Sequence, residues 1–456
     1  MSELGRVSEL GRVLRLDARR TALLVAVPAL TGVGTVTAWL SLGPNVAYWD
    51  NAVAALINTV RVLGPAAACL AAWAAVRERR IDYLRDLTAR SPATGPLLDL
   101  MLLTAAALAA YGAVTVVIVV ETLMRDEAGR PHPLGVAAGA SALVLHVVFG
   151  YLGGRVVPHP ATVTAVAVAT WLWALLRSPG SSWWSLLPPA ALPEVQLFTG
   201  LRTRVLAEQT AWSLGLAAAL VLAYVGWATR RGLVAVPVAA AMALTGAGAA
   251  GLRSSHGQAA APAPVTLACR EWPLTVCVHP ALRSALPALS NAATPLASRL
   301  AGTPVAFTRV EQRPEQEPPR VAHGVAIIHL KDLSPGFATR VLRQIQDALV
   351  DARACATSPD PMAAEYRSLV DAWLLGAEPP VITDTEAARR FNGWREETRR
   401  AWLRRHYTDY RHCALGPGHF RPSSARPQRH TAAQLRRRSP RPAPDIAPRP
   451  AGAPGG

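Results

Sequence analysis

The chain has 456 residues, a formal net charge of +17 and 51% hydrophobic residues, but these averages combine two dissimilar halves. At least six apolar segments of about twenty residues lie between residue 21 and residue 251, and eighteen apolar residues suffice to cross a hydrocarbon core of ~30 Å. The composition therefore indicates an integral membrane protein. The arginines flank the apolar segments or lie in the C-terminal half, so the basic charge does not indicate nucleic-acid binding.

Residues 1–20 precede the first apolar segment and contain the repeated hexapeptide SELGRV. Their spaced leucines and valines predict a short amphipathic helix on the cytoplasmic membrane surface, and the alternative is a disordered lead. The apolar segment that follows five arginines is longer than the core of a secretory signal, so we expect it to be a membrane anchor.

Seven membrane-spanning helices are predicted, over residues 21–42, 53–76, 97–123, 134–156, 160–176, 210–228 and 232–251. With the N-terminus in the cytoplasm, the inner flanks carry thirteen arginines: Arg6, Arg12, Arg15, Arg19, Arg20, Arg77, Arg79, Arg80, Arg85, Arg90, Arg155, Arg230 and Arg231. The outer flanks carry five: Arg125, Arg130, Arg177, Arg202 and Arg204. This asymmetry favours a cytoplasmic N-terminus, and seven crossings then place the C-terminal half outside.

Few polar side chains lie inside the predicted spans, and such residues are functional candidates. They are Arg61, Glu121 and His146. Arg61 is expected either to reach outward to the interface or to pair with Glu121, and His146 is expected to form a hydrogen bond between helices rather than to relay protons.

The segment between the second and third spans, Val76–Pro92, concentrates charge between two apolar runs. Ile81, Leu84 and Leu87 recur at helical spacing opposite charged residues, which predicts a short cytoplasmic amphipathic helix that docks a partner. It ends at Ser91-Pro92, and the alternative is a solvated positive-inside loop.

In position and style, VRERRIDYLRDLTARSP resembles the coupling segment of permease subunits of type-2 ABC exporters, and the likeness covers about 230 residues. The resemblance implies a bundle that exports a substrate with the power of a separate ATP-binding subunit. It also implies the residues that face this subunit: Glu78, Arg79, Tyr83, Leu84 and Leu87. The seventh span and the large C-terminal half depart from the six-span pattern of this family.

The predicted fold class is a membrane bundle of about seven helices followed by a mainly helical α+β domain. Its expected parts are the lead 1–20, the bundle 21–251, a polar linker 252–265, an extracytoplasmic domain 266–420 and a disordered Pro/Arg-rich tail 421–456. Residues 274–279 and 325–330 are predicted strands, with a weaker one at 304–310, and helices are expected at 337–352, 362–375 and from 383 to 412.

Four of the five cysteines fall in the C-terminal domain, an even number that suits disulfides outside the cytoplasm. Three pairings are possible. The favoured one joins Cys269 to Cys277 and Cys355 to Cys413, and the alternative is four unpaired buried thiols. Part of this domain, CVHPALRSALPAL, resembles an uncharacterised domain that follows permease-like helices in bacterial membrane proteins.

Motifs of catalysis are missing from the sequence: it contains no phosphate-binding loop, no H-E-x-x-H and no G-x-S-x-G. We therefore expect neither an enzyme nor a metal or other cofactor, although six histidines lie in the C-terminal domain. The leading hypothesis is a plasma-membrane permease-like subunit of an ABC-type export or self-resistance system, whose expected partners are lipids, a separate ATPase and a second permease subunit in a homo- or hetero-dimer. The alternative is a non-transporting receptor or scaffold whose outer domain binds a ligand or partner.

Overall fold

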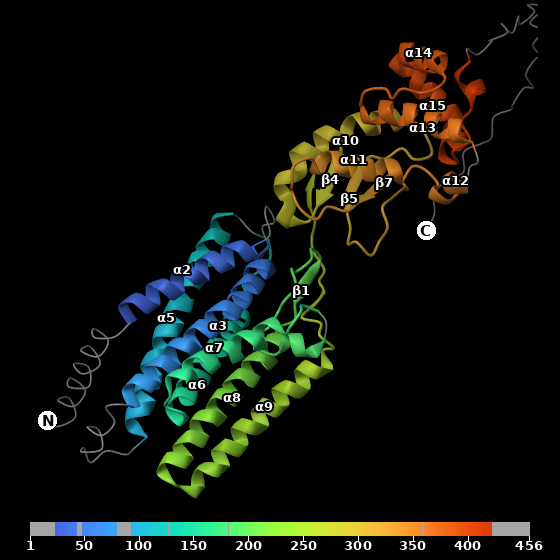
Figure 1. The fold of residues 1–456 in the computed structure, drawn as a ribbon. Coiled ribbons are helices and arrows are strands. Elements are labelled where there is room, and N and C mark those ends of the chain that lie inside the picture. The colour runs from blue at the N-terminus through green and yellow to red at the C-terminus, as the bar shows by residue number, and fades with distance from the viewer. Residues whose placement is uncertain are drawn as a thin grey trace, which may run out of the picture.

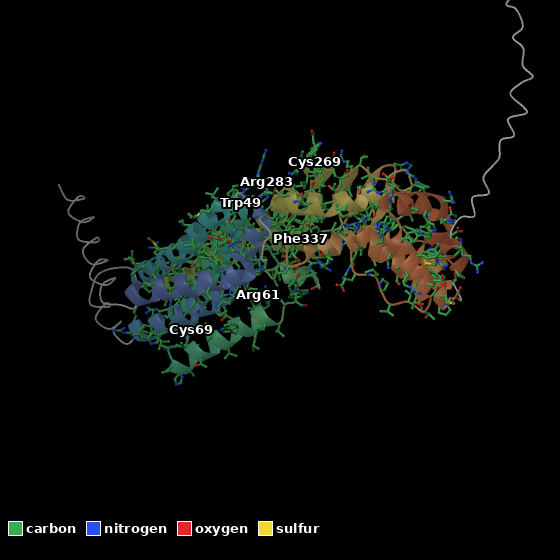
Figure 2. The ribbon with its side chains drawn as sticks, turned by 90° about the horizontal axis from the view of Figure 1, so that it is seen from above. Trp49, Arg61, Cys69, Cys269, Arg283 and Phe337 are labelled. Carbon is green, nitrogen blue, oxygen red and sulfur yellow. A yellow bond between two sulfur atoms is a disulfide. The ribbon has the colours of Figure 1, made fainter. Side chains whose placement is uncertain are left out.

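A computed structural model describes residues 23–42, 48–79, 93–125, 128–180, 182–357 and 360–421. Figures 1 and 2 show, in two views, two bodies end to end, a helical bundle and a smaller α+β region. The predicted N-terminal amphipathic lead, most of the segment Val76–Pro92 and the C-terminal tail lie outside the described residues.

All seven predicted apolar segments form helices, with these bounds: α2 (Leu23–Ser41), α3 (Trp49–Arg79), α5 (Thr94–Met124), α6 (Pro133–Val156), α7 (Pro160–Leu175), α8 (Thr203–Thr229) and α9 (Ala235–Ser254), which follows η2 (Gly232–Val234). Five of the described helices are long and apolar enough to cross a membrane, while α7 and the part Ala26–Ser41 of α2 are shorter. At 1.5 Å per residue, the 16 residues of α7 extend ~24 Å, less than a full hydrocarbon core. Seven crossings therefore stay a prediction.

Successive helices run in opposite directions, so each end of the bundle collects alternate connections (Figure 1). At the junction end, next to the α+β region, Tyr48 pairs with Ala128, and β1 (Thr199–Leu201) pairs with β2 (Ala260–Pro262). At the opposite end, which we call the loop end, Arg79 donates a hydrogen bond to the carbonyl of Arg155. Helix α2 begins at the loop end, so the start of the bundle and the α+β region lie at opposite ends.

Helix α3 forms the core of the bundle and packs against α2, α5, α6 and α7. Glycines on α6 allow its backbone to lie directly on α3. A Cβ at Gly150 or Gly154 would meet the backbone carbonyl of Ala68 or Ala72, respectively. Small residues at such crossings are the usual means of close helix packing in membranes.

The α+β region holds a five-stranded sheet in the order β3-β4-β5-β7-β6. The strands are β3 (Ala268–Arg270), β4 (Thr275–Val278), β5 (Arg309–Gln312), β6 (Arg320–Ala322) and β7 (Val325–Ile328). The central three are parallel and the two edge strands are antiparallel to their neighbours. Both main predicted strands are confirmed, whereas the weaker third begins only at Arg309.

Helices complete a shared apolar core with this sheet: η3 (Pro280–Ala285), α10 (Leu286–Leu300), α11 (Phe337–Asp347), α13 (Pro361–Leu375), α14 (Thr385–Gly393), α15 (Glu396–Arg411) and η4 (Pro417–Phe420). The short helix α12 (Ala352–Thr357) lies outside this core. The predicted helix from 383 to 412 is divided, because Trp394 adopts an extended backbone after Gly393. The mainly helical α+β class is confirmed. The predicted linker 252–265 is shorter than expected, since α9 continues to Ser254 and residues 260–262 form β2.

Candidate functional site

The docking residues implied by the family resemblance divide at the limit of the described chain. Helix α3 continues to Arg79, so Glu78 and Arg79 belong to its last turn rather than to a separate helix. Tyr83, Leu84 and Leu87 lie outside the described residues. The structure therefore shows where the segment leaves the bundle, namely at the loop end of its most buried helix.

A polar cluster surrounds this exit. The Tyr151 hydroxyl donates to Asp99 Oδ2 over 3.5 Å, and the charges of Glu78 and Arg155 lie close enough to act on the same hydroxyl. Arg155 is buried, and its carbonyl accepts the bond from Arg79. The chain on either side of the segment 80–92 is thus tied to α6. Asp99 and Tyr151 were not predicted, although Asp99 is the one acidic residue in the first half of its apolar run.

One of the two alternatives for Arg61 was an ion pair with Glu121, and the structure shows other partners for both residues. Glu121 accepts a bond of 2.7 Å from Arg125 Nε, one turn along α5. Arg61 Nη2 instead donates to the carbonyls of Ala174, at 2.9 Å, and Arg177, at 3.3 Å. These are orphan carbonyls at the C-terminus of α7, so Arg61 caps a neighbouring helix.

His146 lies buried between α6 and α3, but its hydrogen bond is not between helices. Its Nδ1 lies 2.7 Å from the carbonyl of Ala142, four residues earlier in α6. The ring packs on α3 at Gly64, where a Cβ would lie 2.9 Å from it. The hydrogen bond that the structure shows for His146 is thus within α6, and a bond between helices stays a prediction.

A buried stretch of irregular backbone between α7 and α8 accounts for polar residues that the sequence did not single out. It contains η1 (Trp183–Leu186), and residues 185–192 are buried throughout. Asn58 of α3 bonds both backbone groups of Leu192, donating to the carbonyl at 3.1 Å and accepting from the amide at 3.0 Å. Other side chains each bond single backbone groups nearby: Asn51 accepts from the Val195 amide, while Gln209, Trp173 and Arg177 donate to the carbonyls of Leu186, of Pro188, and of Leu187 and Pro189, respectively.

Such backbone is tolerated at membrane depth only where protein replaces water as its hydrogen-bonding partner. Asn58 lies nine residues into α3, ~14 Å from Trp49 along the helix, so the irregular stretch enters the bundle. Polar side chains of α3, α7 and α8 therefore hold this irregular stretch, residues 185–192, inside the junction end, and we call it the plug. These side chains bond backbone groups and do not form a row of carboxylates of the kind that transfers protons.

The α+β region is joined to this end through His279. Its ring lies between Tyr48 and Phe198, with centroids at 5.3 and 5.2 Å and both rings nearly perpendicular to it. Nδ1 accepts the amide hydrogen of Ala281 and so caps η3. Burial lowers the pKa of His279 to about 4, and the ring is neutral at pH 7.

Charged and backbone groups surround this aromatic contact. Tyr48 donates its hydroxyl to the carbonyl of Thr199, and Asp50, buried at the start of α3, lies 3.3 Å from His132 Nε2. Asp50 Oδ1 also accepts from the Leu201 amide at 3.4 Å. Helix α3, strand β1 and the α+β region are thus connected at one place.

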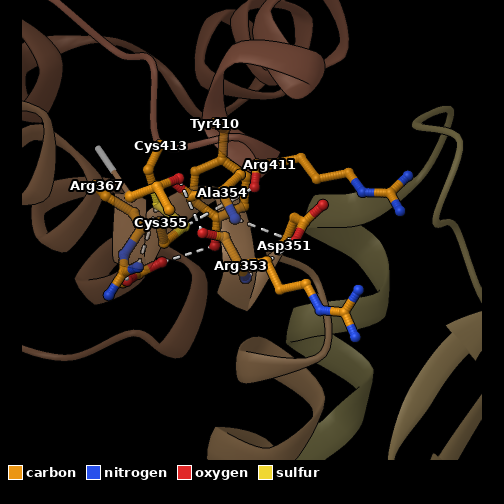
Figure 3. The surroundings of a disulfide bond; sticks show 10 residues. Asp351, Arg353, Ala354, Cys355, Arg367, Tyr410, Arg411 and Cys413 are labelled. Atoms are coloured by element: carbon orange, nitrogen blue, oxygen red, sulfur yellow. Dashed lines mark hydrogen bonds and ion pairs between the residues drawn. A yellow bond between two sulfur atoms is a disulfide. The ribbon is translucent and has the colours of Figure 1, made fainter. Parts of the chain in front are cut away.

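Both bonds of the favoured disulfide pairing are present, Cys269–Cys277 and Cys355–Cys413. The first joins paired residues of β3 and β4. Figure 3 shows the second, which ties α12 to the end of α15 while Asp351 caps α12 through the amides of Arg353 and Ala354.

Comparison with known proteins adds no relative. No family model, curated protein or solved structure matches the chain. The functional argument therefore rests on the residues themselves.

Proposed function

We propose that the chain is the permease-like membrane subunit of an ABC-type export or self-resistance system, powered by a separate ATPase. The observation that carries the proposal is the course of α3. Its 31 residues extend ~46 Å without a break, from the buried contacts of Tyr48 and Asp50 at the junction end to Arg79 at the loop end. The most buried helix of the bundle thus leads directly into the segment 80–92.

The charges and the disulfides support one orientation. The sequence assigns thirteen arginines to the flanks at the loop end and five to those at the junction end; of the thirteen, Arg77, Arg79, Arg155, Arg230 and Arg231 belong to the described residues. A cytoplasmic loop end satisfies the positive-inside rule. Two disulfides lie in the body at the other end, which suits an oxidising compartment. In this orientation the segment 80–92 meets a cytoplasmic ATPase, and the α+β region lies outside.

The test is retention of an ATP-binding subunit by the tagged full-length chain, purified in mild detergent from its native membrane. We expect a photoactivatable ATP analogue to label a co-purifying protein and vanadate-sensitive ATP hydrolysis to accompany it. Reversing Arg80→Glu and Arg85→Glu together is expected to remove both signals, because it reverses the positive charge of the segment that we propose docks the ATP-binding subunit.

The matched control reverses Arg230→Glu and Arg231→Glu, in the turn between α8 and α9 at the same end. It changes the charge of the loop end by the same amount, so any effect on membrane orientation is shared. The control is expected to keep the ATP-binding subunit. Equal loss in both double variants, or a wild-type preparation without such a subunit, contradicts the proposal.

A second function is favoured by the plug at the junction end. Side chains satisfy the irregular backbone there, and the α+β region is held at both His279 and the β1–β2 pair. Such rigidity suits a membrane-anchored receptor or scaffold that presents its outer domain to a ligand. Absence of the ATP-binding subunit, together with ligand binding by the intact protein, would favour this alternative.

A further inference from the structure

Three potential metal ligands come together in the α+β region, apart from every feature used above. His406 and Asp409 project from α15 three residues apart, and His419 comes from η4 after the chain turns back. Their donor atoms all lie within 4.8 Å of one another. Each side chain is between one-fifth and one-half exposed, which leaves a path for an ion.

The distances suit a small tetrahedral ion. His406 Nδ1 lies 3.6 Å and His419 Nε2 lies 3.3 Å from Asp409 Oδ2. Zinc bonds of ~2.0–2.1 Å at tetrahedral angles separate neighbouring donors by ~3.3–3.4 Å. The donors of the third pair, His406 and His419, lie within 4.8 Å, so the two rings must approach each other to bind one ion.

His419 is held where a ligand must be. Trp402 Nε1 donates to its carbonyl at 2.6 Å, and the next residue, Phe420, is fully buried against the Tyr366 and Trp402 rings. The Nδ1 atom of His419 accepts a hydrogen bond from the Gly416 amide at 2.9 Å and lies 3.1 Å from the Gly416 carbonyl. Binding of a metal at Nε2 requires the hydrogen on Nδ1, which then donates to this carbonyl, the usual kind of outer partner of a ligating histidine, instead of accepting from the amide.

We propose that His406, Asp409 and His419 bind a divalent first-row transition-metal ion, for which zinc is the best fit. Two imidazoles and one carboxylate are ligands that zinc accepts, and water completes the fourth position. The ion joins η4 to α15, so it fixes the last described turn of the chain. The site was not expected from the sequence, because the three ligands are spread over fourteen residues and form no recognised metal-binding motif.

The experiment uses the purified full-length chain with its disulfides intact, a tag without histidine, and prior removal of metal by chelation. Zinc is titrated against a chromophoric chelator, and elemental analysis gives the stoichiometry. We expect one ion per chain, and Asp409→Asn or His419→Gln weakens its affinity at least tenfold. Cobalt in place of zinc gives visible absorption bands that neither variant shows.

The control is His412→Gln, an exposed histidine beside Cys413 on the same stretch of chain. It retains wild-type affinity, because it is not a ligand. Near-ultraviolet circular dichroism checks that each variant is folded. No zinc binding by the wild type below about 100 μM, or a loss with His412→Gln as large as that with Asp409→Asn, overturns the proposal, and the histidine–carboxylate contacts are then only ion pairs.

Discussion

Asn58 shows how a single amide inside a membrane bundle can be structural. It supplies both a donor and an acceptor to Leu192, so two backbone groups that water cannot reach are satisfied by one side chain. Arg61 does comparable work at the end of α7. Both side chains therefore stabilise backbone groups of a neighbouring segment that no helix or strand satisfies.

Replacing Asn58 by Leu is expected to destabilise the protein by about 2–4 kcal/mol, because it leaves two buried backbone groups unpaired. Unfolding in mixed micelles measures the change. Thr37→Val is the control, since the Thr37 hydroxyl bonds only carbonyls of its own helix, and it should stay within about 0.5 kcal/mol of the wild type. Equal effects of the two changes would refute the role given to Asn58.

His279 gives the junction a pH dependence whose sign can be worked out. Its pKa in the folded state, about 4, lies below the ordinary 6.5, so the unfolded chain takes up the proton first as the pH falls. The contribution of the neutral His279 ring to the free energy of unfolding is complete above pH 6.5. It is lost progressively as the pH falls towards 4, by an amount on the order of 3 kcal/mol.

The substitution His279→Asn isolates this contribution. Asparagine can still accept the Ala281 amide as a cap but takes up no proton. Thermal unfolding of wild type and variant between pH 7 and pH 4 should therefore show the flatter profile in the variant. Parallel profiles would mean that other groups cause the loss.

Among the elements, α3 and α6 form the closest pair, and glycine decides how close they come. Gly150→Ala places a methyl group on the Ala68 carbonyl and is expected to cost about 1–3 kcal/mol, as overpacking does. Gly112→Ala on α5 meets nothing within 4 Å and should be neutral or slightly stabilising. Unfolding in mixed micelles compares the two, and a similar loss in both would contradict the close approach.

The two disulfides should contribute unequally, because their loops differ in length. Cys355–Cys413 closes a separation of 58 residues and Cys269–Cys277 one of 8. Chain entropy then predicts about 4 kcal/mol for the first and about 2.5 kcal/mol for the second. Each pair is replaced by serines, and chemical unfolding of the full chain measures the loss of stability. A larger loss for the Cys269–Cys277 pair than for the Cys355–Cys413 pair would contradict this order.

Elements were predictable from sequence where one local pattern decided them. The apolar runs produced all seven bundle helices, and the β-branched stretches around Val276 and Ile327 produced strands. Helix α10 escaped prediction because Pro287 and Pro295 interrupt its pattern, and β3 and β6 have only three residues each. The partners of Arg61, Asn58 and His279 depend on how distant elements pack, which no local pattern contains.

For the whole molecule, the decisive question is which side of the membrane each end faces. Single cysteines at two turns answer it in a Cys69→Ala background. Val381, 98% exposed in the α+β region, and Gly232, in the α8–α9 turn, mark the two ends.

We expect a membrane-impermeant maleimide to label Val381→Cys in intact cells, and Gly232→Cys only after the membrane is opened. This follows from the arginine asymmetry and from the disulfides. Labelling of Gly232→Cys in intact cells would invert the topology and place the disulfide-bonded body in the cytoplasm.

The pairing of β1 with β2 has a consequence for how the chain is made. Ribosomes synthesise β1 before α8 and α9, and its partner β2 only after them, so the edge of β1 waits unpaired until the bundle is nearly complete. The aromatic partners of His279, Tyr48 and Phe198, wait in the same way. A chain cut after α9 would keep the edge of β1 unpaired. A C-terminal fragment expressed alone would lack β1 and the two aromatic partners of His279. The two bodies are thus best regarded as successive stages of a single assembly.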